Sequence, residues 1–531
     1  MFGETVMMPR LVVNADREEP KWRYIGQRDF EILSNDDKTA ESLAKVLPSA
    51  LQVADVLVPP RVRLGPGKSV TFVLERQRPG ARYLLETPWP GSRRGFDSPH
   101  IMLCEQDSYV AYHATVNSSA VRYNIEEGNS RIGFNHFLLW TIRRSGLKPA
   151  QWLSSSVWGA VGSEVLMVTT DELRLDMGTI RHPDGSVRIR SLIPLGRAVQ
   201  VLNRPFGQTD GAVEEFAEAT NTGRSLVLWA WLAENGKYRD RFWDFYVRSA
   251  SSADAGEALF RECMQLSYAE ATEQMEAFYR KMPGGKLNLS VKKLVPVLGG
   301  LPVEPVRDAT PAEVARITGE LLRMATTPDA HNLQFQLESD RALLAAAGKI
   351  FERGLKQMES PADPKLYAAA GIFLAQLGRD PAALPYLEAA AAGVGLVRPR
   401  AYLELARIRL AAALEQPGGA MQKLSAEQHR EVLTLLERAY AQSKEQDRYY
   451  EAFMTLWENT ELKPERTDLE SLRELPNIFP QASVAMLRAA QLHARHGFDA
   501  EARALCASGL VFASEEDIWS ALAELQRILA P

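Results

Sequence analysis

The residues of this chain best suited to chemistry lie between positions 135 and 164. This stretch reads NHFLLWTIRRSGLKPAQWLSSSVWGAVGSE, a pattern typical of a helix, a short loop and a second helix. A zinc hydrolase site on such a helix needs His-Glu-x-x-His, because residues four apart place both imidazoles on one face and the Glu activates the zinc-bound water. A third ligand from the next helix completes the protein's share of the tetrahedron. The stretch holds one histidine, His136, so most of these residue types are missing.

Three segments together resemble the gluzincin-type (peptidase MA-like) zinc metallopeptidases, a family often fused to tetratricopeptide repeats. They are DFEILSNDDKTAESLAKVL near the start, the stretch 135–164, and TGRSLVLWAWLAENG at 222–236. The resemblance covers residues 22–282, roughly half of the chain. Members carry His-Glu-x-x-His, a short loop and Trp-Leu-x-Glu-Gly, and Trp152 and Leu153 stand where that second element is expected.

Applied residue by residue, the resemblance implies a site that has lost its chemistry. His136 takes the place of the first zinc ligand, and Phe137 stands where the catalytic Glu is expected. Trp140 replaces the second His, and Ser155 replaces the third-ligand Glu. Phe and Trp do not bind zinc, and loss of the base alone costs ~10²–10⁴ in rate. We therefore interpret these four positions as vestigial, and we predict no catalytic residue and no bound metal.

The leading functional prediction is a non-catalytic pseudopeptidase that binds a protein or peptide partner. The helical repeats, together with the vestigial cleft, are the expected binding surfaces. One alternative is an active zinc peptidase with non-standard ligands, such as His113 or Glu164 beside His136. Zinc is a cofactor only under that alternative. The other alternative is a purely structural scaffold.

Three further motifs have simpler explanations. GPGKS at 65–69 resembles a phosphate-binding loop, but Val62 stands where the first Gly is required, and the next residues read as a strand, not a helix. The serine run 154–156 lacks the glycines of a nucleophile elbow, so helix capping is its expected role. His493 and His496 are expected at a solvated helix end, where a cation near the C-terminus is favourable.

The composition is that of a soluble globular protein with several domains. The chain has 531 residues, of which 46% are hydrophobic and 24% charged, and its formal net charge is −5. This charge gives no reason to expect nucleic acid or an anionic membrane as a partner. No segment has the roughly 18 uninterrupted apolar residues of a membrane span.

Two sequence features bear on the compartment. The cysteines Cys104, Cys263 and Cys506 match no metal or redox spacing and are expected to be buried thiols. The N-terminus shows no signal peptide, whereas the family resemblance favours an exported or periplasmic protein. Localisation therefore stays open.

The elements that would position the site are strands and helices in the first half of the chain. Strands are predicted at 28–34, 69–75 and 109–116, and a helix is predicted at 40–54 with a kink or break at Pro48. Further along, we expect a short strand at 187–196 and helices at 225–236 and 256–282. The aromatic residues between 229 and 246 are expected to lie in the core.

The second half reads as helical. Thr310, Pro311 and Glu313 form a helix start with a capping box. Helix pairs with small residues at their contacts are predicted at 363–393 and 483–509, a spacing similar to tetratricopeptide repeats.

In these pairs the small residues are expected at Gly371, Ala383 and Ala390, and again at Ala490 and Ala502, with Gly378 and Gly497 between the helices. A weaker copy is predicted at 400–415 with its second helix at 431–443. A plain helical bundle is the alternative to a repeat stack.

The predicted fold class is α+β, a gluzincin-like mixed domain with a small sheet and helices, followed by a tetratricopeptide-like α-helical solenoid. The predicted parts are an N-terminal tail (1–21), the degenerate peptidase domain (22–282), a linker with short strands (283–306) and the repeat domain (307–531).

Overall fold

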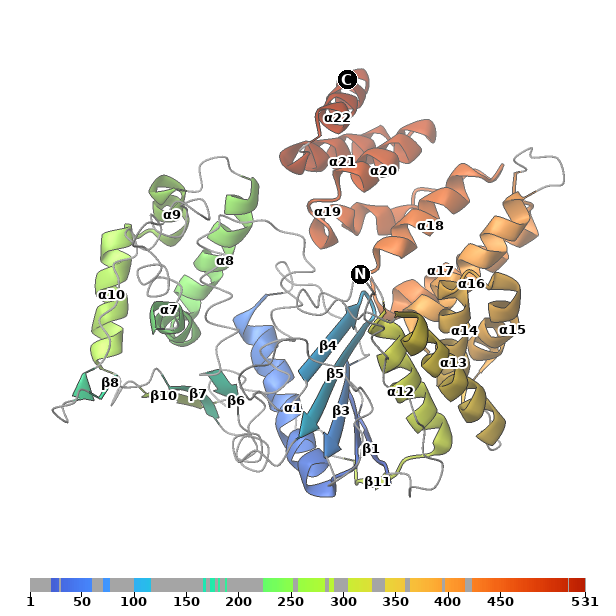
Figure 1. Ribbon diagram of the computed structural model, residues 1–531. Coiled ribbons are helices and arrows are strands. Elements are labelled where there is room, and N and C mark those ends of the chain that lie inside the picture. Colours follow the sequence, from blue (N-terminus) through green and yellow to red (C-terminus); the bar gives the residue numbers. More distant parts are fainter. Residues whose placement is uncertain are drawn as a thin grey trace, which may run out of the picture.

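The computed structural model describes most of the helical half of the chain and selected elements of the first half (Figure 1). The described residues are 21–27, 30–59, 70–76, 100–115, 166–168, 172–176, 180–181, 187–188, 223–251, 256–281, 286–290, 304–326, 340–358, 363–393, 397–415, 423–513 and 515–530.

A six-stranded mixed sheet forms the centre of the described N-terminal part, in the order β11-β1-β2-β3-β5-β4. Strands β2, β3 and β5 run parallel, and the other pairs are antiparallel. The strands are β1 (Arg23–Gly26), β2 (Glu31–Ser34), β3 (Val70–Arg76), β4 (His100–Glu105), β5 (Ser108–Thr115) and β11 (Arg307–Asp308).

Helices cover both faces of this sheet, because successive strand residues point to opposite sides. Phe72 and Leu74 of β3 pack with α1 (Asp37–Leu57) on one face. Val73 packs on the other face, in a core shared with α12 (Pro311–Met324). Figure 1 shows the sheet between α1 and α12. Part of the helical half thus shares a core with the N-terminal sheet.

Further helices and two small sheets belong to the described N-terminal part. Helices α7 (Gly223–Glu234) and α8 (Gly236–Ser251) bury Trp231, Trp243 and Tyr246, which confirms the predicted core role of these aromatic residues. Trp243 Nε1 donates to the carbonyl of Leu57 at 2.8 Å, which joins α8 to the end of α1. A three-stranded sheet and a two-stranded ribbon complete the set, formed by β6 (Leu166–Val168), β7 (Glu172–Asp176), β10 (Lys286–Ser290), β8 (Ile180–Arg181) and β9 (Val187–Arg188).

Several element predictions for the first half are confirmed and one is wrong. The predicted strands correspond to β2, β3 and β5, while β1 and β4 were not predicted. Helix α1 continues through Pro48, so of the kink or break predicted there the break does not occur. The single helix predicted at 256–282 is two helices, α9 (Glu257–Met264) and α10 (Tyr268–Arg280). Gln265 ends the first in the left-handed region (φ 56°), and the Ser267 capping box starts the second.

The helical half begins as predicted. The Thr310 hydroxyl accepts from the Glu313 N–H, the Glu313 carboxylate accepts from the Thr310 N–H, and Pro311 opens the helix. The helices that follow are α13 (Asp340–Gln357), α14 (Pro364–Gln376), α15 (Asp380–Ala392), α16 (Pro399–Leu414), α17 (Ala426–Gln442), α18 (Asp447–Glu458), η4 (Glu470–Glu474), α19 (Leu475–Ile478), α20 (Ser483–Arg495), α21 (Asp499–Phe512) and α22 (Glu516–Ile528).

Two helix pairs end their first helix in the same way. Gly378 and Gly497 have φ values of 68° and 78°, which favour glycine. In the first pair the Arg379 N–H donates to the Leu374 carbonyl at 3.0 Å, and in the second the Phe498 N–H donates to the His493 carbonyl at 2.9 Å. Both are Schellman turns, and they confirm the predicted helix pairs α14–α15 and α20–α21.

The predicted small residues are buried in the helical half. A Cβ on Gly371 would come within 2.7 Å of the Leu387 side chain, so only glycine allows this approach. Ala383, Ala390 and Ala490 are fully buried, as is Ala502. In the weaker copy, α17 begins five residues earlier than predicted, at a Ser425 capping box.

Buried ions join the sheet to the helices. Glu105, at the end of β4, accepts 2.6 Å bonds from both terminal nitrogens of Arg323, whose side chain is fully buried in α12. Arg323 also donates to Glu320 at 2.8 Å. Burial alone would raise the pKa of Glu105, but the nearby guanidiniums of Arg323 and Arg400 hold that pKa well below its usual value. The carboxylate is therefore ionised and paired.

The turn between β4 and β5 extends this network to α16 and α18. Asp107 accepts from Arg398 at 2.5 Å and from the backbone N–H of Arg400 at 2.9 Å. The Gln106 carbonyl accepts from Gln446, at the start of α18, at 3.2 Å. One tight turn of the sheet thus contacts three separate helices, and the network of Glu105, Asp107, Glu320, Arg323, Arg398 and Arg400 fixes their arrangement.

Replacing Arg323 by alanine should destabilise the protein strongly. The change leaves Glu105 and Glu320 buried with fewer partners, and breaking one side of a buried pair typically costs about 3–5 kcal/mol. The measurement is the urea midpoint of unfolding of the full chain. Arg527→Ala removes an exposed pair with Glu524 and should leave the midpoint unchanged. Equal midpoints for the two variants would contradict the structural role of the network.

Candidate functional site

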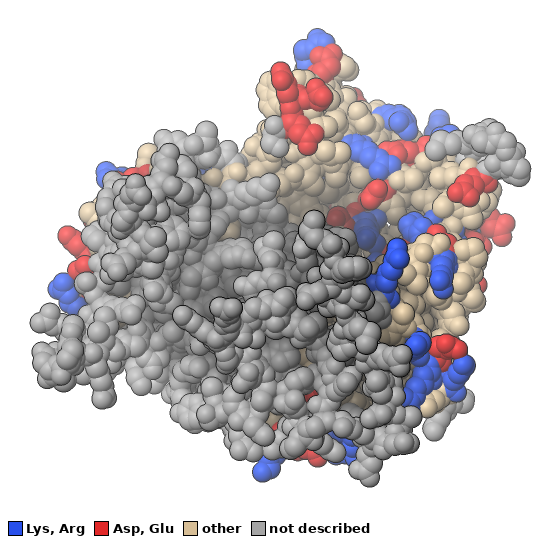
Figure 2. Space-filling view, viewed as in Figure 1, with Lys and Arg blue, Asp and Glu red and all other residues tan. Residues whose placement is uncertain are grey.

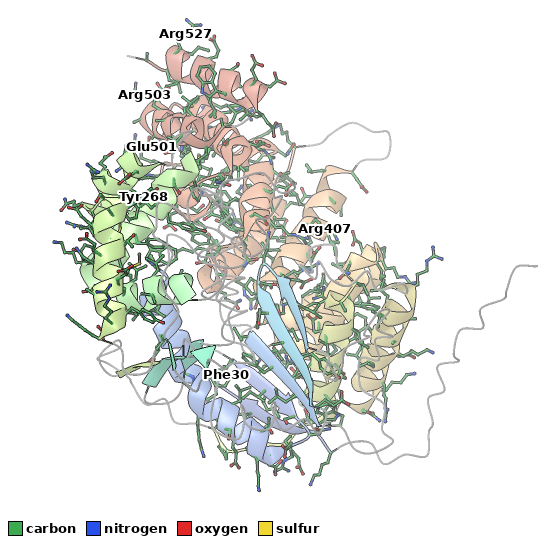
Figure 3. The ribbon with its side chains drawn as sticks, turned by 60° about the vertical axis from the view of Figure 1, so that its left-hand side comes forward. Phe30, Tyr268, Arg407, Glu501, Arg503 and Arg527 are labelled. Atoms are coloured by element: carbon green, nitrogen blue, oxygen red, sulfur yellow. The ribbon has the colours of Figure 1, made fainter. Side chains whose placement is uncertain are left out.

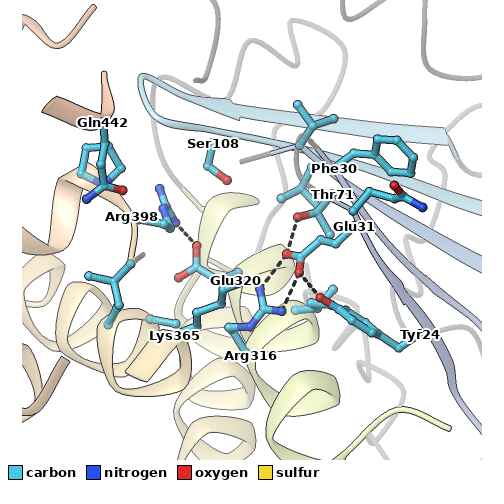
Figure 4. Close-up of a pocket in the computed structure, with 18 residues that line it drawn as sticks. Tyr24, Phe30, Glu31, Thr71, Ser108, Arg316, Glu320, Lys365, Arg398 and Gln442 are labelled. Atoms are coloured by element: carbon cyan, nitrogen blue, oxygen red, sulfur yellow. Dashed lines mark hydrogen bonds and ion pairs between the residues drawn. The ribbon is translucent and has the colours of Figure 1, made fainter. Parts of the chain in front are cut away.

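A cavity of about 300 Å³ lies at the amino ends of the parallel strands β2, β3 and β5. Glu31, Thr71 and Ser108 line it from the sheet, and α12, α14 and the start of α16 close it from the helical side (Figure 4). This cavity lies beside the buried ion network, because Glu320 and Arg398 belong to both.

Glu31 is the fixed centre of the cavity. Its Oε1 accepts from Thr71 at 2.9 Å and from Arg316 at 2.6 Å, and its Oε2 accepts from Tyr24 at 3.0 Å and from Arg316 at 2.6 Å. Figure 4 shows the three donors converging on this one carboxylate. Both oxygens are satisfied without a ligand, so Glu31 acts mainly to hold the arginine in place.

The electrostatics of the cavity favour binding over proton transfer. Burial opposes the charge of Glu31, but Arg316 outweighs that effect and lowers the Glu31 pKa to about 2. Burial and the neighbouring carboxylate raise the pKa of Tyr24 above its usual value. A general base works best with a pKa near the working pH. An anionic carboxylate that already accepts four hydrogen bonds and a neutral phenol are therefore suited to recognition rather than to acid–base chemistry.

A second hollow, of about 480 Å³, opens among the C-terminal helices. We call it the C-terminal groove. One face of α18 forms its floor, because Asp447, Tyr450, Glu451 and Met454 follow helical spacing. The other sides are formed by the segment 475–488 and by Phe512, Glu515 and Ile518. Its lining is thus apolar inside, with the carboxylates of Asp447, Glu451 and Glu515 at the edge and one cation, Arg488, which pairs with Glu458.

The same helices expose apolar side chains. Val484, which lines the C-terminal groove, is 58% exposed, and Trp519 on α22 is 51% exposed. Val511 and Ile528 are also more than half exposed. Figure 2 shows acidic side chains gathered over this end of the molecule. In Figure 3 the C-terminal end, where Glu501, Arg503 and Arg527 are labelled, lies away from Phe30 and the sheet.

The predicted vestigial positions His136, Phe137, Trp140 and Ser155 lie outside the described residues, as does Glu164, so they stay predictions. The structure places His113 on β5, opposite His100 of β4. Within the described ranges, no group of three or more His, Cys, Asp or Glu residues is arranged to hold a metal ion.

The prediction of a solvated histidine pair at the end of α20 is wrong for His493. Its ring is fully buried, next to Phe498 with centroids 6.0 Å apart, because the Gly497 turn folds the chain back over it. Neither ring nitrogen has a hydrogen-bond partner among the described residues. Burial lowers the His493 pKa to about 4, so the ring is neutral.

Sequence reasoning missed the charged residues of the cavity, although one signal was present. Arg316, Glu320 and Arg323 recur at helical spacing on α12, among the apolar residues of the buried stretch 315–324. Charged residues within an apolar helix face indicate buried ion pairs. Their partners Glu31 and Glu105 lie more than 200 positions away in sequence, which spacing does not reveal. The free thiols Cys263 and Cys506 are buried as predicted.

Comparison of the chain with protein-family models, with curated proteins and with solved structures gives no match. In the part of the chain that the structure describes, no helix is both long and apolar enough to cross a membrane.

His493 should make stability depend on pH below neutrality. The pKa of His493 in the folded protein is about 4, below the ordinary 6.5. Its contribution to the free energy of unfolding is therefore complete above pH 6.5 and is lost as the pH falls toward 4. The loss is on the order of 3 kcal/mol. Urea midpoints of the full chain between pH 7 and 4 measure it, compared with His493→Leu. The urea midpoint of the variant should fall less steeply with decreasing pH. If the midpoints of the two proteins fall in parallel, His493 is not the titrating group.

Proposed function

We propose that this chain is a non-catalytic interaction protein that binds a partner peptide in the C-terminal groove. The supporting observation is the combination of an apolar hollow of about 480 Å³ with an acidic edge. Asp447, Glu451 and Glu515 make no ion pair among the described residues. The complementary partner carries apolar side chains flanked by Lys or Arg.

The arrangement of the helical half supports this proposal. The pairs α14–α15 and α20–α21 share the same glycine turn and have buried small residues at matching positions, features typical of a tetratricopeptide-like stack. In such a stack each pair buries its apolar face against the next, and a concave surface remains for a partner. We propose that the C-terminal groove is the part of this surface nearest the end of the stack.

The proposed loss of catalysis rests on the sequence. With Phe137 and Trp140 in place of the base and a zinc ligand, the resemblance to gluzincin-type peptidases favours a pseudopeptidase as the N-terminal part. The partner would then be held, not cleaved. An active peptidase would need a metal site assembled around His136 from residues distant in sequence.

Charge reversal at the groove should weaken binding of a basic peptide. The probe is a short amphipathic peptide of leucine and lysine, and its leucine–glutamate counterpart should not bind. Glu451→Lys should reduce affinity by about tenfold, because an edge charge is partly screened by water. Fluorescence anisotropy with the full chain measures both peptides.

Glu427→Lys is the matched control, because it reverses one exposed charge in the first turn of α17. It should bind like the unmodified protein. If Glu451→Lys and Glu427→Lys bind the basic peptide equally well, the C-terminal groove is not the binding surface. If the basic and the acidic peptide bind equally well, charge does not contribute to binding at the groove.

Zinc content tests the pseudopeptidase interpretation. After stripping and re-addition of zinc, neither the unmodified chain nor His136→Ala should retain the metal, because the ligand positions are filled by groups that do not bind it. Elemental analysis after gel filtration is the measurement. About one zinc per chain that is lost in His136→Ala would establish the alternative of an active metallopeptidase.

A further inference from the structure

The cavity beside the sheet contains hydrogen-bond donors that lack acceptors. Arg316 Nε and Gln27 Nε2 are both buried, and neither has a partner within the described part of the chain. Both residues line the cavity. Buried donors are nearly always paired in folded proteins, because an unpaired one loses its bonds to water. Two such unpaired donors around one cavity indicate a ligand that supplies acceptor atoms.

The charges around the cavity leave one cation uncompensated. Glu31 pairs with Arg316 at 2.6 Å, and Glu320 pairs with Arg398. The remaining charged group is Lys365, which is exposed at the start of α14. Its ammonium makes no ion pair among the described residues, and it lies close enough to act on Glu31. A lysine at the cavity without a carboxylate partner favours a ligand with a single negative charge.

The rest of the wall is apolar. Val110 of β5, Ile317 of α12 and Ala369 of α14 face the cavity, with Phe30 and Val397 beside them. A volume of about 300 Å³ is at the small end for ligand sites. It suits a compact molecule with an apolar body and one polar end. The small side chain of Ala369, which is 1% exposed, leaves room for that body.

We propose that this cavity binds a small organic carboxylate with an apolar body, either as a free acid or as the end of a peptide. The carboxylate accepts from Lys365, Gln27 and the Nε of Arg316, while Glu31 fixes the guanidinium through its terminal nitrogens. The apolar body packs between β5 and the helices α12 and α14. This site is separate from the C-terminal groove, and it stands whether or not the groove binds a peptide.

Isothermal titration of the full chain with isocaproate tests the proposal, with isocaproamide as the neutral analogue of the same shape. The amide should bind at least about tenfold more weakly, because a charge-assisted hydrogen bond is replaced by a neutral one. Lys365→Met should weaken isocaproate binding roughly tenfold to a hundredfold. Lys349→Met removes an exposed lysine from α13 and should change nothing.

A second ligand pair distinguishes the two sources of carboxylate. N-acetylleucine represents a peptide end, and tighter binding than isocaproate identifies that source, whereas the reverse order identifies a free acid. Either order supports the site when Lys365→Met weakens binding. The proposal is overturned if neither carboxylate binds, if the amide binds as well as the acid, or if Lys365→Met binds like the unmodified chain. Gln27→Leu, which removes a donor without changing charge, should also weaken binding several-fold.

Discussion

The burial of charge at the turn between β4 and β5 is the constraint on which the rest of the structure depends. Glu105 and Asp107 enter the interior, where an ionised carboxylate is stable only with cations beside it. Those cations come from α12 and α16, so the helices must sit where their arginines reach the turn. The apolar core between the sheet and α12 adds stability but does little to fix the position of the helix on the sheet, because hydrophobic contact is not directional. The ion network fixes the positions of α12 and α16 relative to the sheet.

Both candidate sites follow from this arrangement. Holding α12 across the parallel strands leaves the cavity at their amino ends, with Arg316 fixed one turn from Glu320 and two from Arg323. The contact of Gln446 with the same turn sets the start of α18, whose outward face forms the floor of the C-terminal groove. One site is small, charged and enclosed by two halves of the chain. The other is larger, apolar and acidic at its edge, and belongs to the helical end alone.

What the sequence predicts well here is local. The apolar runs of β3 and β5, the Thr310 capping box and the glycine turns at 378 and 497 all depend on residues a few positions apart. Long-range pairing has no such signature, so the partners of Glu31 and Glu105 were not foreseen. The ending of α9 at Gln265 was missed because a non-glycine residue in the left-handed region leaves no pattern. His493 was misplaced because helix ends usually face water, while this one is folded under its own turn.

The central claim is that the sheet and α12 to α16 form one cooperative unit held by buried ions. Native-state hydrogen exchange of the full chain in low urea tests it most directly. Amides of β5 (108–115) and of α12 (311–324) should open together, with the same free energy and the same dependence on urea. If α12 to α16 stay protected while the strands exchange, the two parts unfold independently and the network does not join them.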